Sequence, residues 1–85
     1  AKNPMSANFA DRIALSPDYS VVEVRTPSYW VGKTLKELDL RRAHELNVVG
    51  IKDGDRVEIT PDPDIPLKEE SILMLIGANK TLEKL

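Results

Sequence analysis

The sequence predicts a small α+β domain that is built on one mixed β-sheet, with the element order (α)-β-α-β-β-β-α. Three features of the sequence support this class. Segments that are typical of strands, rich in β-branched and apolar residues, occur at residues 19–26 and 71–77. Between them lies a helix-start signal at Thr34. A hairpin signal follows at Asp53-Gly54. We therefore expect four strands and a few short helices to share one core.

The composition limits the class of protein. A chain of 85 residues is long enough for one domain only. The hydrophobic content of 41% indicates a folded chain, and no apolar run approaches the ~20 residues of a membrane-spanning helix. The formal net charge of -2 lacks the basic excess of a protein that binds a nucleic-acid polymer. The absence of cysteine excludes disulfides and thiolate metal sites, and no signal peptide is predicted.

The first 18 residues are interpreted as a linker from a preceding domain. A short helix is expected at residues 5–13, because Phe9 and Ile13 are four residues apart and would share one helix face. Ser16-Pro17-Asp18 should end this helix. We therefore place the domain boundary between residues 1–18 and residues 19–85.

Residues 19–43 predict the first strand of the domain and a helical region after it. "YSVVEVRT" at residues 19–26 predicts a strand, which Pro27 ends. Tyr29 and Trp30 lie in the loop after it, and they fit either a surface anchor or packing on the core. Thr34 and Glu37 form the pattern of a capping box. Leu40 breaks the 3.6-residue period, so we expect two short helices that meet near residues 39–41.

The second half of the chain predicts three strands and a final helix. "NVVGIK" and "RVEIT" at residues 47–52 and 56–60 read as a hairpin around Asp53-Gly54. "PDPDIP" at residues 61–66 must be a rigid, extended loop, because proline fixes φ and donates no hydrogen bond. "SILMLIG" predicts a strand that is buried on both faces. Asn79 is expected to cap the final helix.

The residues do not indicate an enzyme or a resident metal cofactor. His44 is the single histidine, with no cysteine and no serine motif beside it, so a nucleophile–base pair is not expected. One histidine is too few for a transition-metal site. Carboxylates gather between Asp53 and Glu70, but their spacing does not match a calcium-binding loop. A cation-sensing site built from loops remains an alternative.

Cationic and amide groups gather in "LDLRRAHELNVVGI", at residues 38–51. One interpretation is structural: Arg41, Arg42 and His44 complement the dipole at a helix C-terminus, and Asn47 ends the helix. The other interpretation is a ligand site. Arginine matches phosphate oxygens with its planar fork, and an amide can donate and accept at an adenine edge.

The order of four motifs resembles a known family. They are "VGKTLKELDLR", "VVGIKDGDRV", "PDPD" and "ILMLIG". Together they are similar to the C-terminal domain of the regulator-of-potassium-conductance family (TrkA-C, or RCK C-terminal domain) over residues 19–85. Residues 5–20 more loosely resemble the joining segment in the cytosolic gating subunits of Ktr-type potassium transporters.

This resemblance implies a function in potassium transport. The implied protein is a cytoplasmic, homodimeric regulatory domain that lies peripheral to a membrane potassium-transport subunit and is not inserted in the membrane. A nucleotide-binding domain would precede it in the same chain. The implied ligand is cyclic di-AMP, bound at the two-fold interface to modulate transport. The alternative is a ligand-free dimerisation and assembly module of a cation channel or antiporter regulator.

The resemblance also implies the ligand-binding residues. Arg41 of the "LDLR" motif and Asn47 would contact the ligand. The expected walls and a contributing proline are Leu35, Val48, Ile51 and Pro63, with Pro61 as a near alternative. Relatives often have an aromatic residue and a glycine where this chain has His44-Glu45. A glutamate that points inward would oppose the two phosphate charges, whereas His44 is a further candidate for contact with the ligand.

Overall fold

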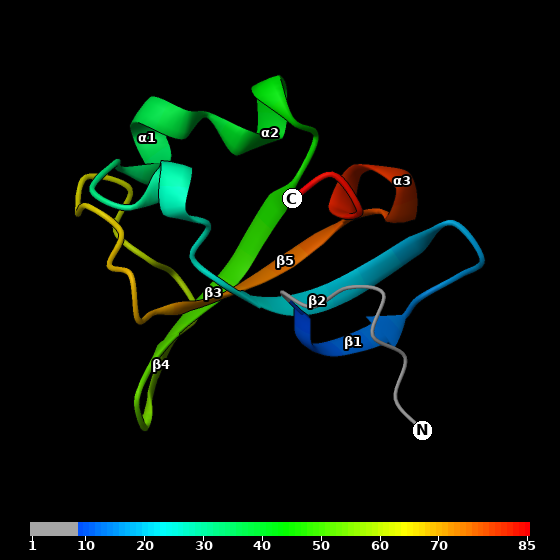
Figure 1. The fold of residues 1–85 in the computed structure, drawn as a ribbon, viewed down its shortest axis with the longest axis horizontal. Helices are drawn as coiled ribbons and strands as arrows, with labels where there is room; N and C mark the ends of the chain where they lie inside the picture. Colours follow the sequence, from blue (N-terminus) through cyan, green and yellow to red (C-terminus); the bar gives the residue numbers. More distant parts are fainter. Residues whose placement is uncertain (1–8) are drawn as a thin grey trace.

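The computed structural model describes residues 9–85 and shows one five-stranded sheet (Figure 1). The strand order is β1-β2-β5-β3-β4, and all four pairings are antiparallel. The predicted α+β class is therefore confirmed, although the sheet is not mixed in strand direction. The strands are β1 (Phe9–Ala14), β2 (Tyr19–Arg25), β3 (Asn47–Asp53), β4 (Arg56–Glu58) and β5 (Ile72–Ala78).

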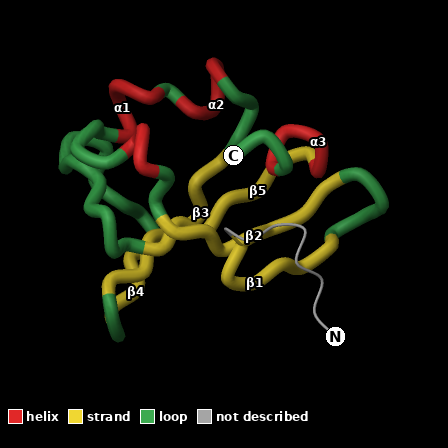
Figure 2. Tube along the Cα trace, in the orientation of Figure 1, coloured by secondary structure: helices red, strands yellow, loops and turns green. Residues whose placement is uncertain are grey.

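Four short helical segments accompany the sheet, and they are the red tube segments in Figure 2. The buried side chains of β2 and β5 pack against apolar side chains from the helices and loops. The core therefore lies on one side of the sheet, which we call the inner face. Within residues 9–85 the helices lie on that side of the sheet (Figure 1), so the prediction that the 71–77 strand is buried on both faces is wrong. Along β5, buried residues alternate with partly exposed ones. The helical segments are η1 (Ser28–Trp30), α1 (Leu35–Leu38), α2 (Leu40–Ala43) and α3 (Asn79–Leu82).

The helix that was predicted at residues 5–13 is wrong over the described part. Residues 9–14 form β1, which pairs with β2 in a register that places Ile13 opposite Val21. The spacing of Phe9 and Ile13 fits a helix, but the segment forms a strand because it pairs with β2 through the tight turn that joins the two strands. The Ser16 hydroxyl accepts hydrogen bonds from the backbone N–H of Asp18 and Tyr19, both at 3.2 Å. Residues 5–8 of the predicted helix lie outside the described residues.

Two further boundaries differ from the sequence prediction. β4 ends at Glu58, so the predicted strand at residues 56–60 is too long. Asn79 does not cap α3 with its side chain. Instead, its amide accepts a hydrogen bond from the Ser20 hydroxyl at 2.6 Å and donates one to the Pro17 carbonyl at 3.0 Å. Asn79 therefore holds the β1–β2 turn against the end of β5.

The predicted capping box is confirmed at the start of α1. The Thr34 hydroxyl accepts from the Glu37 backbone N–H at 3.0 Å, and the Glu37 carboxylate accepts from the Thr34 N–H at 2.9 Å. Asp39 has a φ of 48° and separates α1 from α2, as the broken period predicted.

Replacing Thr34 with alanine should lower the free energy of unfolding by about 1 kcal/mol, because the cap loses its side-chain acceptor. Urea denaturation measures the change. Thr60→Ala, at an exposed threonine outside any helix, is the matched control and should have a smaller effect. Equal losses for the two variants would contradict a stabilising cap.

Candidate functional site

A cavity of about 450 Å³ opens where α1 and α2 meet the beginning of β3 and the loop of residues 61–66, which we call the proline loop. Five of the residues that the sequence analysis assigned to a ligand line this cavity: Leu35, Arg41, Asn47, Val48 and Pro63. The remaining lining residues come from the same elements and their flanks. They are Asp39, Leu40, Leu46, Ile59, Thr60 and Pro61, of which only Pro61 was named from the sequence as a candidate ligand contact.

The backbone explains how these side chains converge. The Lys36 N–H donates to the Pro63 carbonyl at 3.1 Å, which fastens the proline loop to α1. Glu45 has a φ of 57° and turns the chain from α2 into β3. Leu46 is then buried, with its side chain against Gly77. Asn47 follows on the outer face of the sheet, opposite Ile76.

The polar groups of the site are available to a ligand. Among the described residues, neither the Arg41 guanidinium nor the Asn47 amide forms a side-chain hydrogen bond or an ion pair. Both side chains are exposed at the cavity. The neighbouring Arg42 differs, because it lies 3.9 Å from the Asp39 carboxylate. The cavity therefore offers a guanidinium that can donate hydrogen bonds to a phosphate, and an amide, beside apolar side chains.

Two of the assigned residues do not line this cavity. His44 is exposed, and its ring centroid lies 6.2 Å from that of Trp30. Trp30 itself is in the core, whereas Tyr29 is exposed. Ile51 is buried further along β3 and lines a different cavity. The structure thus separates His44 and Ile51 from Arg41 and Asn47.

A side hollow of about 280 Å³ adjoins the cavity. Arg41, Leu46 and Asn47 line both spaces. The other residues of the side hollow are Tyr19, Glu45, Ile76 and Gly77. Glu45 therefore belongs to the surroundings of Arg41, where a negative charge opposes an anionic ligand.

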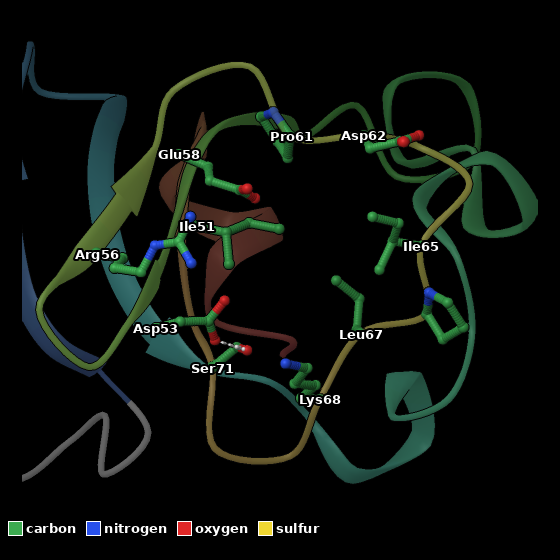
Figure 3. A pocket seen from close by; sticks show the side chains of 11 residues that line it. Ile51, Asp53, Arg56, Glu58, Pro61, Asp62, Ile65, Leu67, Lys68 and Ser71 are labelled. Carbon is green, nitrogen blue, oxygen red and sulfur yellow. Dashed lines mark hydrogen bonds between the residues drawn. The ribbon is translucent and has the colours of Figure 1, made fainter.

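A third space, of about 220 Å³, lies between the β3–β4 hairpin and residues 61–68 (Figure 3). Pro61 lines this space as well as the 450 Å³ cavity. The Ser71 hydroxyl donates to the Asp53 carboxylate, and Arg56 and Lys68 add positive charge. Within residues 9–85, no group of three His, Cys, Asp or Glu side chains is arranged to hold a metal ion.

Comparisons with known proteins agree on one family. The model of the TrkA-C domain matches residues 20–85. Ktr system potassium uptake protein C of Bacillus subtilis (strain 168) is 37% identical over 78 residues, which are 92% of this chain and 35% of that protein. The chain thus spans about a third of the length of this curated relative.

Solved structures support the same assignment. The RCK C domain of the potassium transport protein KtrA, in complex with cyclic diadenosine monophosphate (cyclic di-AMP), superimposes with a TM-score of 0.72 at 32% identity and 78% coverage of both chains. The GsuK RCK domain gives a TM-score of 0.64 at 32% identity, with coverage of 82% of this chain and 16% of that one. With the family model covering most of its length, this chain belongs to the TrkA-C domain family.

Proposed function

We propose that the chain is a cytosolic regulatory domain of a potassium transport system, which forms a homodimer and binds cyclic di-AMP at its two-fold interface. The observation that carries this proposal is the cavity in which Arg41 and Asn47 lie together without side-chain partners among the described residues. The similarity to a potassium uptake protein and to an RCK C domain in complex with cyclic di-AMP supports it. The proposed role is sensing rather than catalysis.

The chemistry of the cavity suits this ligand. The Arg41 fork can donate two parallel hydrogen bonds to a phosphate. The Asn47 amide can donate to and accept from an adenine edge. Leu35, Val48 and Pro63 provide apolar walls for the base. A two-fold symmetric dinucleotide on a dimer axis would meet this set of residues twice, so a few side chains per chain suffice.

Regulation follows from a difference in affinity. A ligand that contacts both protomers favours the dimer arrangement in which the two cavities face each other, and it shifts the population towards that arrangement. A preceding nucleotide-binding domain of the same protein would pass this shift to a membrane potassium-transport subunit. None of the helices within residues 9–85 is long and apolar enough to cross a membrane. As part of this proposal, the domain lies in the cytoplasm, peripheral to the transporter, as the resemblance to its family implies.

Thermal unfolding with and without nucleotide tests the proposal. At a hundred times its Kd, cyclic di-AMP should add about 2.7 kcal/mol of stability per ligand bound. Because one ligand would be shared by two chains, the Tm of the dimer should rise by roughly 5–10 °C. AMP at the same concentration is the control and should give a much smaller rise. A dimer in sedimentation experiments whose Tm does not respond to cyclic di-AMP would indicate the ligand-free assembly module instead. Stabilisation by millimolar calcium alone would indicate a cation site.

Replacing Glu45 with glutamine should tighten cyclic di-AMP binding by roughly two- to tenfold. The substitution removes a negative charge from the surroundings of Arg41 and leaves the side-chain size unchanged. The gain should shrink as salt is added, because Glu45 is exposed and its charge is screened. Glu69→Gln, at an exposed carboxylate that lines neither the cavity nor the side hollow, is the matched control. Unchanged affinity of Glu45→Gln at low salt would contradict this electrostatic role.

A further inference from the structure

An aromatic residue that has no role in the proposed function lies at the side hollow beside Asn47. Tyr19 is the first residue of β2, and its side chain is 54% exposed. It lines the side hollow together with Arg41 and Asn47. Of the described aromatic side chains, Trp30 is buried and Tyr29 lies against it at 6.0 Å between ring centroids, whereas Tyr19 borders this space.

The sheet register brings Tyr19 and Asn47 to the same face. Asn47 on β3 is opposite Ile76 on β5, and Ile76 is opposite Val21 on β2. Tyr19 is two residues before Val21, so it projects from the same face of the sheet. Residues Ile76 and Gly77 of β5 lie between the two strands as the floor of the hollow. Tyr19 and Asn47 therefore stand on either side of this floor, each on a strand adjacent to β5.

The side hollow lies next to the 450 Å³ cavity. They share Arg41, Leu46 and Asn47, so a ligand whose phosphate is bound by Arg41 can extend a planar group into either space. An exposed tyrosine ring offers a flat apolar surface for such a group. Any of the nucleobases can stack on an aromatic side chain, because every base has a π-face. The hollow thus suits a nucleobase.

We propose that Tyr19 is a base-stacking residue of the ligand site, whose ring packs on the adenine of a nucleotide that Arg41 binds through its phosphate. This inference rests on the proposed function and adds a specific contact to it. Tyr19 would supply affinity through stacking, and Asn47 would supply the choice of base through hydrogen bonds. The hydrogen bonds that the structure gives Tyr19 outside the sheet involve its backbone only, so they survive a change of side chain.

Calorimetric titration with cyclic di-AMP tests this assignment, with the pair of tyrosines as a matched comparison. Tyr19→Ala should weaken binding by about tenfold or more, and Tyr19→Phe, which keeps the ring, should bind within about threefold of the unmodified chain. Tyr29→Ala removes a ring of nearly equal exposure, 57%, outside the side hollow and should bind unchanged. Tyr19→Val preserves strand propensity and replaces the alanine variant if that variant fails to fold.

The outcomes separate this inference from the proposed function. If the unmodified chain binds cyclic di-AMP and Tyr19→Ala or Tyr19→Val binds equally well, the stacking role is overturned and the proposed function stands. An equal loss for Tyr19→Ala and Tyr29→Ala would also overturn it, because the effect would then be general. If the unmodified chain releases no heat with cyclic di-AMP, the proposed function and this inference are both overturned.

Discussion

Arg41→Ala should weaken the binding of cyclic di-AMP by at least about 100-fold. A charge-assisted hydrogen bond contributes about 1.5–3 kcal/mol, and a ligand on the two-fold axis would lose Arg41 from both protomers. The sum of about 3–6 kcal/mol corresponds to a loss of roughly 10² to 10⁴ in affinity. Calorimetric titration at a fixed ionic strength measures the change.

The adjacent arginine provides the matched control for this variant. Arg42 carries the same charge, but its side chain is 84% exposed and it does not line the cavity. Arg42→Ala should therefore alter the affinity by less than about threefold, through the loss of long-range attraction only. If both alanine variants bind equally, or if Arg41→Ala titrates like the unmodified chain, the assignment of Arg41 to the phosphate is wrong.

Leu46→Ala should lower the free energy of unfolding by about 3 kcal/mol, within the 2–5 kcal/mol range for a buried leucine. Leu46 is 1% exposed, belongs to the hydrophobic core and lies against Gly77 of β5. For a domain of this size, the Tm should fall by roughly 12–24 °C. Leu15→Ala, at a leucine that is more than half exposed in the β1–β2 turn, is the control and should cost less than about 1 kcal/mol.

The contact between Leu46 and Gly77 allows a sharper version of this test. A Cβ at position 77 would collide with the Leu46 side chain, so Gly77→Ala alone should be destabilising by about 1–3 kcal/mol. In the Leu46→Ala background the same Cβ gains room. The double variant should therefore be more stable than the sum of the two single losses predicts. Additive losses would contradict the packing of Leu46 on Gly77.

Local signals in the sequence predicted the parts of the fold that depend on neighbouring residues. The capping box at Thr34 and the hairpin turn at Asp53-Gly54 form because a few adjacent residues satisfy each other's hydrogen bonds or adopt the turn conformation. The strand at residues 9–14 was missed because its conformation depends on pairing with β2. Asn79 was misassigned for a related reason: its amide bonds to residues about sixty positions earlier.

At the candidate site, too, some residues could be predicted from the sequence and others depend on the folded structure. The resemblance to a known family implied Arg41 and Asn47 as ligand contacts, and the structure places both at one cavity. The expected wall residue Ile51 lies elsewhere. A bulge between Val48 and Gly50 keeps Val48 and Ile51 on the inner face, but three residues apart along the strand, which is about 10 Å. Tyr19 carries no local signal of a role at the site, because β5 brings it near Asn47 only in the folded sheet.

The stoichiometry of cyclic di-AMP binding tests the central claim most directly. Isothermal titration of the chain, with its mass in solution determined by sedimentation at the same concentration, gives the number of ligands per chain. We predict a dimer that takes up one cyclic di-AMP for every two chains, because one symmetric ligand would be shared between two copies of the Arg41 and Asn47 cavity. Binding of one ligand per chain by a monomer, or no heat at all, would contradict a shared site at a two-fold interface.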